Sequence, residues 1–573
     1  MLQLPTGIDN FGKVIEKNLT FIDKTLLIKD IIDDSNTEVA VITRPRRFGK
    51  SLNLSMLHYF FTAEAYGRKT AGLFDGLKIS KVDNGAYMQH QGKYPVIFIT
   101  LKVIKDGSFA SVLKKFRFLI EQLYSEHRYL EHSDQLTLEE KGNFLQVVRG
   151  ETDQEKLENA IFYLSSLLYK HHRRKVWLLI DEYDTPIQEA YLHNYYNEMV
   201  AFLRNMFGIA LKSNPYLEKG VLTGILRVSK ESIFSDLNNL RVYSVLQNRY
   251  NQYFGFLEEE VLSLLTKANL QDQIDSVRHW YNGYQFGNTT VYNPWSIISY
   301  INEEGVFRPY WLNTSENTLI KNLFLQFITQ FKEQFEALLQ NQPTEQLVDE
   351  KLVFGYLRSD PASFWTLLVM AGYLKAIASH VDEKGKIYCQ LMIPNLEVKS
   401  LYQDMVEQWL TPLESGSLTW HKEFLDYLLS GNVVKFTENL QHILQYNVSF
   451  HDTAKNPEIF YHGLFLGFLA SINQNTYEIK SNRESGFGRY DIVIIPKDLA
   501  ELAIIIELKK IDSSEETKLL AGAEAALKQI DTKDYLSEFR QRGLNNVLKI
   551  GLAFCGKEFK LLNEKTQLKN ITH

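Results

Sequence analysis

The sequence has few cysteines and no long apolar run. Only two cysteines occur among the 573 residues, Cys389 and Cys555, and they lie far apart. They provide neither a disulfide framework nor the paired spacing of a zinc site, which is typical of a protein in a reducing compartment. The N-terminus lacks the basic-then-apolar layout of a secretory signal, and no apolar run approaches the ~20 residues that a membrane helix needs. We therefore expect a cytoplasmic protein with no membrane partner.

An excess of positive charge is also missing. The formal net charge is −6, so the chain as a whole is not a polybasic nucleic-acid binder. Any contact with DNA or RNA must be local or bridged by metal ions. The chain is too long for a single core, and its 45% hydrophobic and 13% aromatic residues can fill several. We expect a multidomain protein.

Two apolar runs near the C-terminus predict a pair of strands. They span residues 491–495 and 502–508 and are separated by the short polar stretch PKDLAE, which predicts a hairpin-like connection. Asp491 begins the first run, and Glu507 and Lys509, two residues apart and thus on one face, end the second. If the strands pair, Asp491 reaches the same face. Two carboxylates and an ammonium there suit a divalent metal and an activated water, although solvated charges at the ends of two ordinary strands would give a similar pattern.

A strand, a loop and a helix are predicted in succession near the N-terminus. The apolar residues 38–43 precede RPRRFGKS, and the apolar positions from Lys50 onward follow a mostly helical period. Gly49, Lys50 and Ser51 form the ending of the phosphate-binding pattern GxxxxGK[ST], in which glycine lets the backbone approach phosphates and the serine can ligate magnesium. The first glycine of the pattern is replaced by Arg44. The same three residues could also form an ordinary helix N-terminus.

A second motif supports nucleotide chemistry. The stretch 175–184, KVWLLIDEYD, predicts a strand that ends in Asp181 and Glu182. It resembles a Walker B element, in which Asp181 belongs to the magnesium shell and Glu182 polarises the attacking water. Thr223 lies near the end of a further predicted strand, where related ATPases place polar sensor residues, and Arg227 follows it. Arg227 is a candidate phosphate-sensing arginine or, equally, a surface ion-pair partner.

These motifs together resemble a known family. TRPRRFGKSL, LLIDEYDTPI and LTGILRVSKESIFSDLNNL are very similar to the AAA-ATPase-like family found at the N-terminus of bacterial proteins that end in a PD-(D/E)XK nuclease domain. The phosphate-binding loop of that family is likewise rich in arginine. The resemblance implies that Arg46 and Arg47 join Gly49, Lys50 and Ser51 in binding ATP with Mg²⁺.

The C-terminal charges match the pattern of the PD-(D/E)XK superfamily. Asp491 is followed by Glu507, Leu508 and Lys509, and Gln529 lies on a later predicted helix, AGAEAALKQIDTKDYL, similar to one in several of these nucleases. The resemblance implies that the two carboxylates and the carbonyl of Leu508 hold one or two Mg²⁺ ions. Lys509 would assist the attacking water, and Gln529 is a further catalytic candidate.

Additional candidates surround this core pattern. In the resembling superfamily a metal-binding acid can lie on the first helix, so Glu458 is a candidate. Glu484 could be a further ligand, and Arg489 could steady the scissile phosphate. Residues 365–398 are similar to a winged-helix unit, but the mixed charge of their hairpin tip favours a structural role over DNA binding.

The sequence thus predicts an α/β multidomain chain. Residues 1–300 are expected to form a P-loop NTPase parallel sheet with a helical lid, residues 301–447 a winged-helix-like, helical connector, and residues 448–573 a restriction-endonuclease-like α/β domain. We expect ATP binding and hydrolysis coupled to Mg²⁺-dependent cleavage of nucleic acid, DNA more than RNA, by analogy in defence against foreign DNA or in DNA processing. AAA-type ATPases usually work as rings, so a homo-oligomer is expected.

Two alternatives remain open at the level of sequence. The nuclease fold could bind nucleic acid without cleaving it, within an ATP-driven signalling protein. The loop without its first glycine could also bind nucleotide without turnover and act as a switch.

Overall fold

The computed structural model describes most of the chain. The described residues are 2–227, 238–312, 320, 323–324, 327, 330–350, 354, 357, 360–410, 420–447, 472, 476–485, 488–556 and 558–568. They divide into two compact units: the first is Met1–Leu323 with Pro343–Val398, and the second is Phe324–Gln342 with Lys399–His573. The stretch 301–447, expected as a connector, is therefore shared between the two units. Among the described residues, no helix is long and apolar enough to cross a membrane.

The first unit is built on a parallel sheet of five strands in the order β4-β5-β6-β1-β7. The strands are β1 (Val39–Thr43), β4 (Val96–Thr100), β5 (Val176–Asp181), β6 (Leu217–Gly224) and β7 (Leu240–Tyr243). Every residue of β1 and β5 is buried, as expected of parallel strands covered on both faces. The predicted parallel sheet is confirmed. Because β6 lies between β1 and β5, the carboxyl ends of these three strands meet at one edge.

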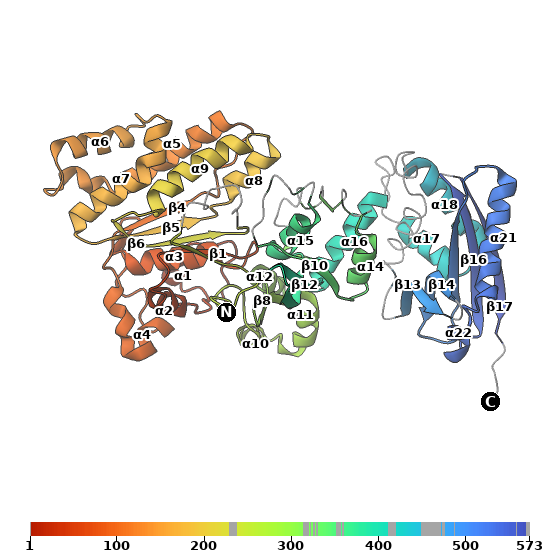
Figure 1. The fold of residues 1–573 in the computed structure, drawn as a ribbon. Helices are drawn as coiled ribbons and strands as arrows, with labels where there is room; N and C mark the ends of the chain where they lie inside the picture. Colours follow the sequence, from red (N-terminus) through yellow and green to blue (C-terminus); the bar gives the residue numbers. More distant parts are fainter. Residues whose placement is uncertain are drawn as a thin grey trace. The chain divides into compact units, whose positions relative to one another are not determined.

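Helices cover both faces of this sheet (Figure 1). One face packs against α5 (Phe109–Glu126), α7 (Gln154–His172) and α9 (Tyr196–Leu211), and the other against α3 (Lys50–Phe61) with α1 (Phe11–Glu16) and α2 (Leu26–Asp33). The smaller elements are β2 (Glu64–Ala65), β3 (Arg68–Lys69), α4 (Lys78–Lys81), α6 (Leu138–Val148) and α8 (Thr185–Leu192), with 3₁₀ turns at Val82–His90 and Arg128–His132.

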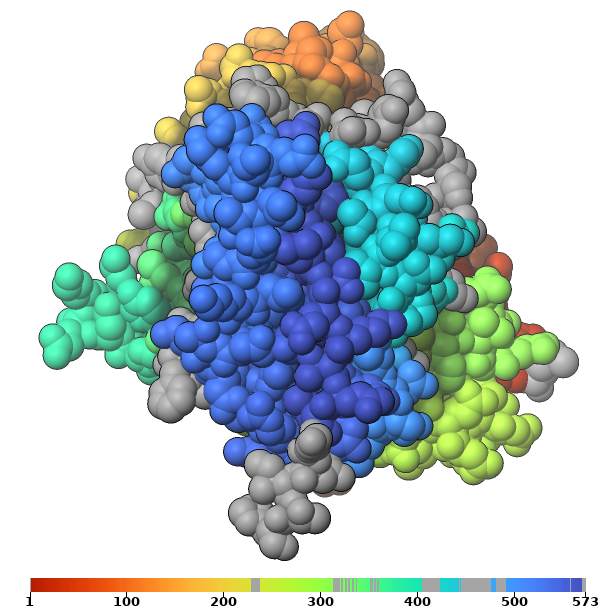
Figure 2. Space-filling view, turned by 90° about the vertical axis from the view of Figure 1, so that its right-hand side faces the viewer, coloured from red at the N-terminus to blue at the C-terminus, as the bar shows by residue number. Residues whose placement is uncertain are grey.

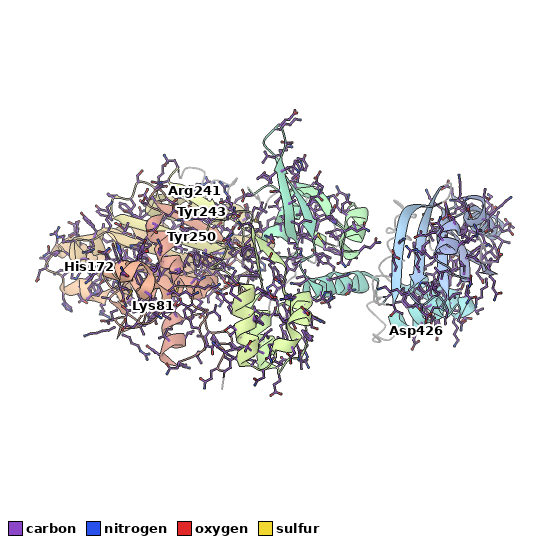
Figure 3. The ribbon with its side chains drawn as sticks, turned by 90° about the horizontal axis from the view of Figure 1, so that it is seen from below. Lys81, His172, Arg241, Tyr243, Tyr250 and Asp426 are labelled. Carbon is purple, nitrogen blue, oxygen red and sulfur yellow. The ribbon has the colours of Figure 1, made fainter. Side chains whose placement is uncertain are left out.

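A helical group with its own core follows β7. It contains α10 (Glu258–Lys267), a 3₁₀ turn (Gln271–Gln273), α11 (Ile274–Tyr281), the hairpin of β8 (Tyr284–Phe286) and β9 (Thr289–Val291), and α12 (Pro294–Asn302). Tyr281, Tyr292 and Tyr300 are buried in that core. At the end of β7 the ring of Tyr243 lies edge-on to Tyr250, with centroids 4.9 Å apart (Figure 3). Tyr284 and Tyr292, in the aromatic stretch after α11, are likewise buried and form packing contacts.

A helix and a small antiparallel sheet complete the first unit. Helix α15 (Pro361–Met370) packs against β10, in a sheet of order β10-β12-β11 whose strands are β10 (Thr344–Leu347), β11 (Lys375–Val381) and β12 (Ile387–Met392). Helix α16 (Leu396–Leu410) follows β12.

The second unit contains a mixed sheet of order β13-β14-β15-β16-β17, in which only the β15–β16 pair is parallel. Its strands are β13 (Tyr477–Ser485), β14 (Gly488–Pro496), β15 (Ala503–Lys510), β16 (Asn546–Cys555) and β17 (Glu558–Gln567), and its helices are α14 (Lys332–Leu339), α17 (Trp420–Leu429), α18 (Val433–Asn447), α21 (Glu516–Thr532) and α22 (Ser537–Gln541). Helices α17 and α18, in cyan, lie beside β17, in dark blue (Figure 2). Val493 and Ile505 share a buried core with Ile530 of α21. The predicted hairpin of β14 and β15 is confirmed.

Candidate functional site

The loop between β1 and α3 presents a helix N-terminus at the edge of the parallel sheet. Gly49 caps α3 in the left-handed conformation, with φ of 83°, which glycine adopts without steric cost. No atom lies within 4 Å of the point where a Cβ would stand on Gly49. The free N–H groups of the first helical turn, with Lys50 beside them, favour an anionic ligand.

Lys50 is buried and bound by the loop itself. Its ammonium donates to the carbonyl of Arg44 at 3.0 Å and to that of Pro45 at 2.8 Å. Burial lowers the pKa of Lys50, while the nearby carboxylates of Glu182 and Asp181 act in the opposite direction. A charged amine so placed can exchange its carbonyl partners for phosphate oxygens, which bind it more strongly.

Two of the predicted residues, Ser51 and Thr223, donate hydrogen bonds to the carboxylate of a third, Asp181. Ser51 Oγ donates to Asp181 Oδ2 at 2.6 Å, and Thr223 Oγ1 donates to Asp181 Oδ1 at 2.6 Å. Burial raises the pKa of Asp181, and its two hydroxyl partners partly offset this. A serine hydroxyl next to a strand-end aspartate is the oxygen set that P-loop proteins use for Mg²⁺. The donor set therefore fits magnesium.

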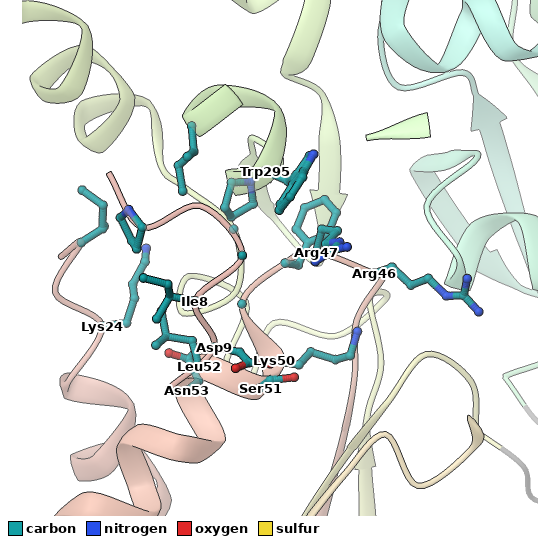
Figure 4. Close-up of a pocket in the computed structure, with 18 of the residues that line it drawn as sticks. Ile8, Asp9, Lys24, Arg46, Arg47, Lys50, Ser51, Leu52, Asn53 and Trp295 are labelled. Carbon is teal, nitrogen blue, oxygen red and sulfur yellow. The ribbon is translucent and has the colours of Figure 1, made fainter. Parts of the chain in front are cut away.

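A cavity of about 330 Å³ opens beside this loop (Figure 4). Its polar lining includes Arg46, Arg47, Gly49, Lys50, Ser51, Glu182 and Asp184, together with Asp9, Lys24, Asn53, Lys102 and Lys105, and its apolar lining includes Leu4, Pro5, Ile8, Ile22, Trp295 and Ile298. The guanidinium of Arg47 lies 4.3 Å from the ring centre of Trp295, which is a cation–π contact. A charged part and an apolar part in one cavity suit a ligand that has both phosphates and an aromatic base.

Glu182 and Arg227 have different positions relative to the cavity. Glu182 lines it and adopts a positive φ of 51°, which is unusual for a residue other than glycine. Thr185 Oγ1 donates to Glu182 Oε2 at 3.3 Å. Arg227 lies half-buried beyond the end of β6 and is not part of the described cavity lining. The structure thus brings Glu182, but not Arg227, to the candidate site.

Arg44, which replaces the first glycine of the pattern, serves the packing of the sheet. It is fully buried and donates to the carbonyls of Thr43 at 2.7 Å, Tyr243 at 2.9 Å and Arg249 at 3.3 Å. Its guanidinium also lies 5.1 Å from the ring centre of Phe286. Both terminal nitrogens of the guanidinium are used in this way, and the side chain has no exposed surface, so Arg44 is not a phosphate ligand.

Sequence reasoning missed Asp184. This buried carboxylate lines the cavity and accepts hydrogen bonds from the backbone of Ile225 and Leu226, both at 2.9 Å. Gln188 also donates to it at 3.0 Å and accepts from Arg46 at 3.4 Å. Asp184 thus ties the loop after β5 to the loop after β6. The signal was the third acid of DEYD, which the strand pattern alone did not distinguish from a solvated charge.

The second candidate site lies at the end of the β14–β15 pairing. Asp491 directly precedes Ile492, and Glu507 directly follows Ile506, its partner in the last pair of this antiparallel register. The backbone N–H of Leu508 donates to Asp491 Oδ2 at 2.7 Å. The predicted approach of Asp491 to the end of the second strand is therefore present.

Glu507 is a buried carboxyl with an unused oxygen. It is 3% exposed, and its Oε1 accepts a hydrogen bond from Gln529 of α21. Its Oε2 is buried and has no hydrogen-bond partner among the described residues. Burial, and then the charge of Asp491, raises the pKa of Glu507 to about 8. Two neighbouring carboxylates with an unsatisfied buried oxygen gain stability from a cation, so this donor set fits Mg²⁺.

The structure describes some of the surrounding candidate residues and not others. Lys509 is half-buried and lies two residues after Glu507 on β15. Glu484 and Arg489 belong to β13 and β14, but their side chains, and the whole of Glu458, lie outside the described part of the structure. In the described part, no group of three or more acidic, histidine or cysteine side chains forms a metal cluster.

Comparisons with known proteins find a family match for an N-terminal and for a C-terminal region of the chain. Residues 5–234 match a family described as predicted AAA-ATPase, and residues 456–564 match the PD-(D/E)XK nuclease superfamily. The chain is 26% identical over 561 residues, 94% of each protein, to an "Uncharacterized protein in vnfD 5'region" of Azotobacter chroococcum mcd 1. The matches confirm the resemblance that the sequence motifs indicated.

Proposed function

We propose that this chain, which combines an AAA-ATPase-like domain with a PD-(D/E)XK nuclease-superfamily domain, binds and hydrolyses ATP and uses it to control Mg²⁺-dependent cleavage of nucleic acid. DNA is the preferred substrate. The observation that supports cleavage most directly is Oε2 of Glu507, which is buried next to Asp491 and has no hydrogen-bond partner among the described residues. A carboxyl that only stabilised the fold would have its oxygens satisfied by the protein.

In the nuclease site each residue has a proposed role. Asp491, Glu507 and the carbonyl of Leu508 hold Mg²⁺, which supplies an activated water and neutralises charge on the phosphate. Gln529 orients the Glu507 carboxylate through the hydrogen bond to its Oε1. Lys509, on the same strand, helps to orient the water or to stabilise the charge that develops on the phosphate.

In the nucleotide site the chain holds the phosphates and the base separately. Arg46, Arg47, Lys50 and the α3 N-terminus bind the phosphates, and Ser51 with Asp181 holds the magnesium. Glu182 orients the attacking water, Thr223 holds Asp181 in place, and Arg227 acts after closure or on a neighbouring copy. The apolar lining with Trp295 encloses the base.

Helices α10–α12 serve as the lid of the nucleotide site, and α15 with β10–β12 is a winged-helix-like unit. The working form is a homo-oligomer.

The nuclease proposal is tested by Mg²⁺-dependent cleavage of single- and double-stranded DNA and RNA. Asp491→Asn and Lys509→Ala should each lower cleavage by about 100-fold or more, the range of a lost catalytic group. Lys510→Ala is the matched control, because Lys510 is exposed and pairs with Asp512. Equal cleavage by Asp491→Asn and the unaltered protein would exclude the assignment. Mg²⁺-independent binding without cleavage would favour the binding module instead.

The nucleotide proposal is tested by ATP affinity and turnover. Lys50→Ala should weaken ATP binding and abolish turnover, because it removes the buried ammonium that the loop before α3 holds in the cavity. Lys81→Ala, on the exposed end of α4, should leave both unchanged (Figure 3). Tight binding with no turnover in the unaltered protein would identify the loop as a switch rather than an ATPase.

A further inference from the structure

A buried carboxylate links the nucleotide site to the start of α16. Glu397 is fully buried in the first turn of that helix. Its Oε1 accepts from the backbone N–H of Trp311 at 2.7 Å, and its Oε2 accepts from Ser296 Oγ at 2.8 Å. A buried carboxylate is tolerated only when such donors are kept. The helix start, residue 311 and α12 are therefore held in one arrangement.

Trp311 extends this link to the phosphate-binding loop. Its indole Nε1 donates to the carbonyl of Arg46 at 3.2 Å. The ring is 1% exposed, and its centroid lies 5.2 Å from that of Tyr373 and 6.0 Å from that of Tyr284. A close-packed ring of this kind cannot move by itself. A displaced Arg46 carbonyl must therefore either break the hydrogen bond or move Trp311 and its partner Glu397.

The loop has a physical reason to change when phosphate binds. The carbonyls of Arg44 and Pro45 share the Lys50 ammonium, for which phosphate oxygens compete. Arg47, the residue after the Arg46 carbonyl, has a strained φ of 68°. A second input comes through α12, because Trp295, which lines the cavity, directly precedes the Glu397 partner Ser296.

We propose that Glu397 is the positioning residue that transmits occupancy of the nucleotide cavity to α16. The inference rests on the proposed nucleotide binding and adds its regulatory route. Helix α16 spans Leu396–Leu410, and the division between the two units falls inside it, after Val398. Helix α16, which begins at the residues linked to the nucleotide loop, is thus one of the segments through which the chain passes into the unit with the nuclease-like sheet. By thermodynamic linkage, the free energy with which bound nucleotide shifts the conformation of α16 equals the free energy with which that shift changes nucleotide affinity.

The experiment is hydrogen–deuterium exchange of the full chain with and without Mg·ADP. In the unaltered protein, nucleotide should change exchange at the start of α16 by about fivefold or more, the lower end of ordinary coupling. Glu397→Gln keeps the shape but replaces one acceptor oxygen with an NH₂ group. Trp311→Phe keeps a ring and removes the donor to Arg46. Both variants should bind Mg·ADP and lose the change at α16. Trp280→Phe is the control, since Trp280 stacks on Phe307 away from the described cavity lining.

The outcomes separate the two proposals. No Mg·ADP binding by the unaltered protein would overturn the proposed function itself. Mg·ADP binding with no change at α16, or with the same change in Glu397→Gln as in the unaltered protein, would overturn only the coupling. If Trp311→Phe does not fold, Glu397→Gln decides the question. A change that persists in Trp280→Phe and is lost in Glu397→Gln supports the coupling over a general loosening of the helical group.

Discussion

At the residue scale, Arg44 explains why the loop can lack the first glycine of its pattern. A phosphate-binding role would leave its guanidinium exposed to the cavity, but the side chain is 0% exposed and bonded to backbone carbonyls. Burial lowers the pKa of Arg44, and its carbonyl partners keep the charge hydrogen-bonded. Arg44 therefore stabilises the loop through hydrogen bonds to backbone carbonyls, while Arg46 and Arg47 line the cavity.

We expect Arg44→Ala to destabilise the first unit by about 3–5 kcal/mol, because it leaves buried carbonyls of Thr43 and Tyr243 unpaired. Arg46→Ala, in contrast, should weaken nucleotide binding with little loss of stability. Thermal unfolding and nucleotide affinity of both variants check the difference. A stable Arg44→Ala protein with reduced affinity would assign the arginine to the phosphates instead.

The protonation of Glu397 predicts a pH dependence of stability. Burial raises its pKa from 4.5 to about 7, so the folded protein binds the proton more tightly than the unfolded chain. Stability from this group is full below its unfolded pKa and is lost as pH rises through about 7, by at most about 3 kcal/mol. Glu397→Gln lacks this titration. The unfolding midpoint of Glu397→Gln, relative to that of the unaltered protein, should therefore rise between about pH 5 and about pH 7.5. Parallel pH profiles of the two proteins would contradict the assignment.

At the scale of elements, the approach of α21 to β16 positions the nuclease site. Gly551 of β16 pairs with Glu507 of β15 in the parallel register. A Cβ on Gly551 would lie 2.5 Å from the carbonyl of Ala523 and 2.7 Å from the backbone nitrogen of Leu527, both in α21. Only glycine allows this approach, and it brings Gln529 of the same helix to Glu507.

Gly551→Ala should therefore push α21 away from the sheet and separate Gln529 from Glu507. We expect a loss of about 1–3 kcal/mol in stability and a fall in cleavage of about 10-fold or more, as for other small displacements of catalytic groups. The control is Gly142→Ala in α6, where a Cβ would meet nothing within 4 Å. That change should be neutral or slightly stabilising. Unchanged cleavage by Gly551→Ala would show that α21 does not position the site.

At the scale of the whole molecule, two units with separate cores should unfold in separate steps. Nucleotide at about 100 times its Kd should stabilise the first unit by about 2.7 kcal/mol and raise its unfolding temperature by several degrees. The step of the second unit, identified by its lowering in Gly551→Ala, should move much less, because the nucleotide acts on that unit indirectly, through α16. Scanning calorimetry with and without Mg·ATP measures both, and Lys50→Ala should lose the shift. A single transition that nucleotide moves as a whole would contradict independent unfolding.

The sequence by itself determined the local elements and the chemistry that they present. The apolar run before GKS predicted β1, and the helical period of the apolar residues from Lys50 onward predicted α3. The two-residue period placed Glu507 and Lys509 on one face of β15. These features follow from neighbouring residues, because strand and helix periods are local. The family motifs added the two domain types, which the comparisons confirm.

The tertiary structure alone decided which distant residues meet. The insertion of β6 between β1 and β5 brings Thr223 and Ser51 to Asp181. Strand order is set by crossover connections, which leave no periodic signal in the sequence. The burial of Arg44 and the contact of Gln529 with Glu507 depend likewise on packing between elements far apart in the chain. The same holds for Glu397, because its partners Ser296 and Trp311 are joined to it only by the folded first unit.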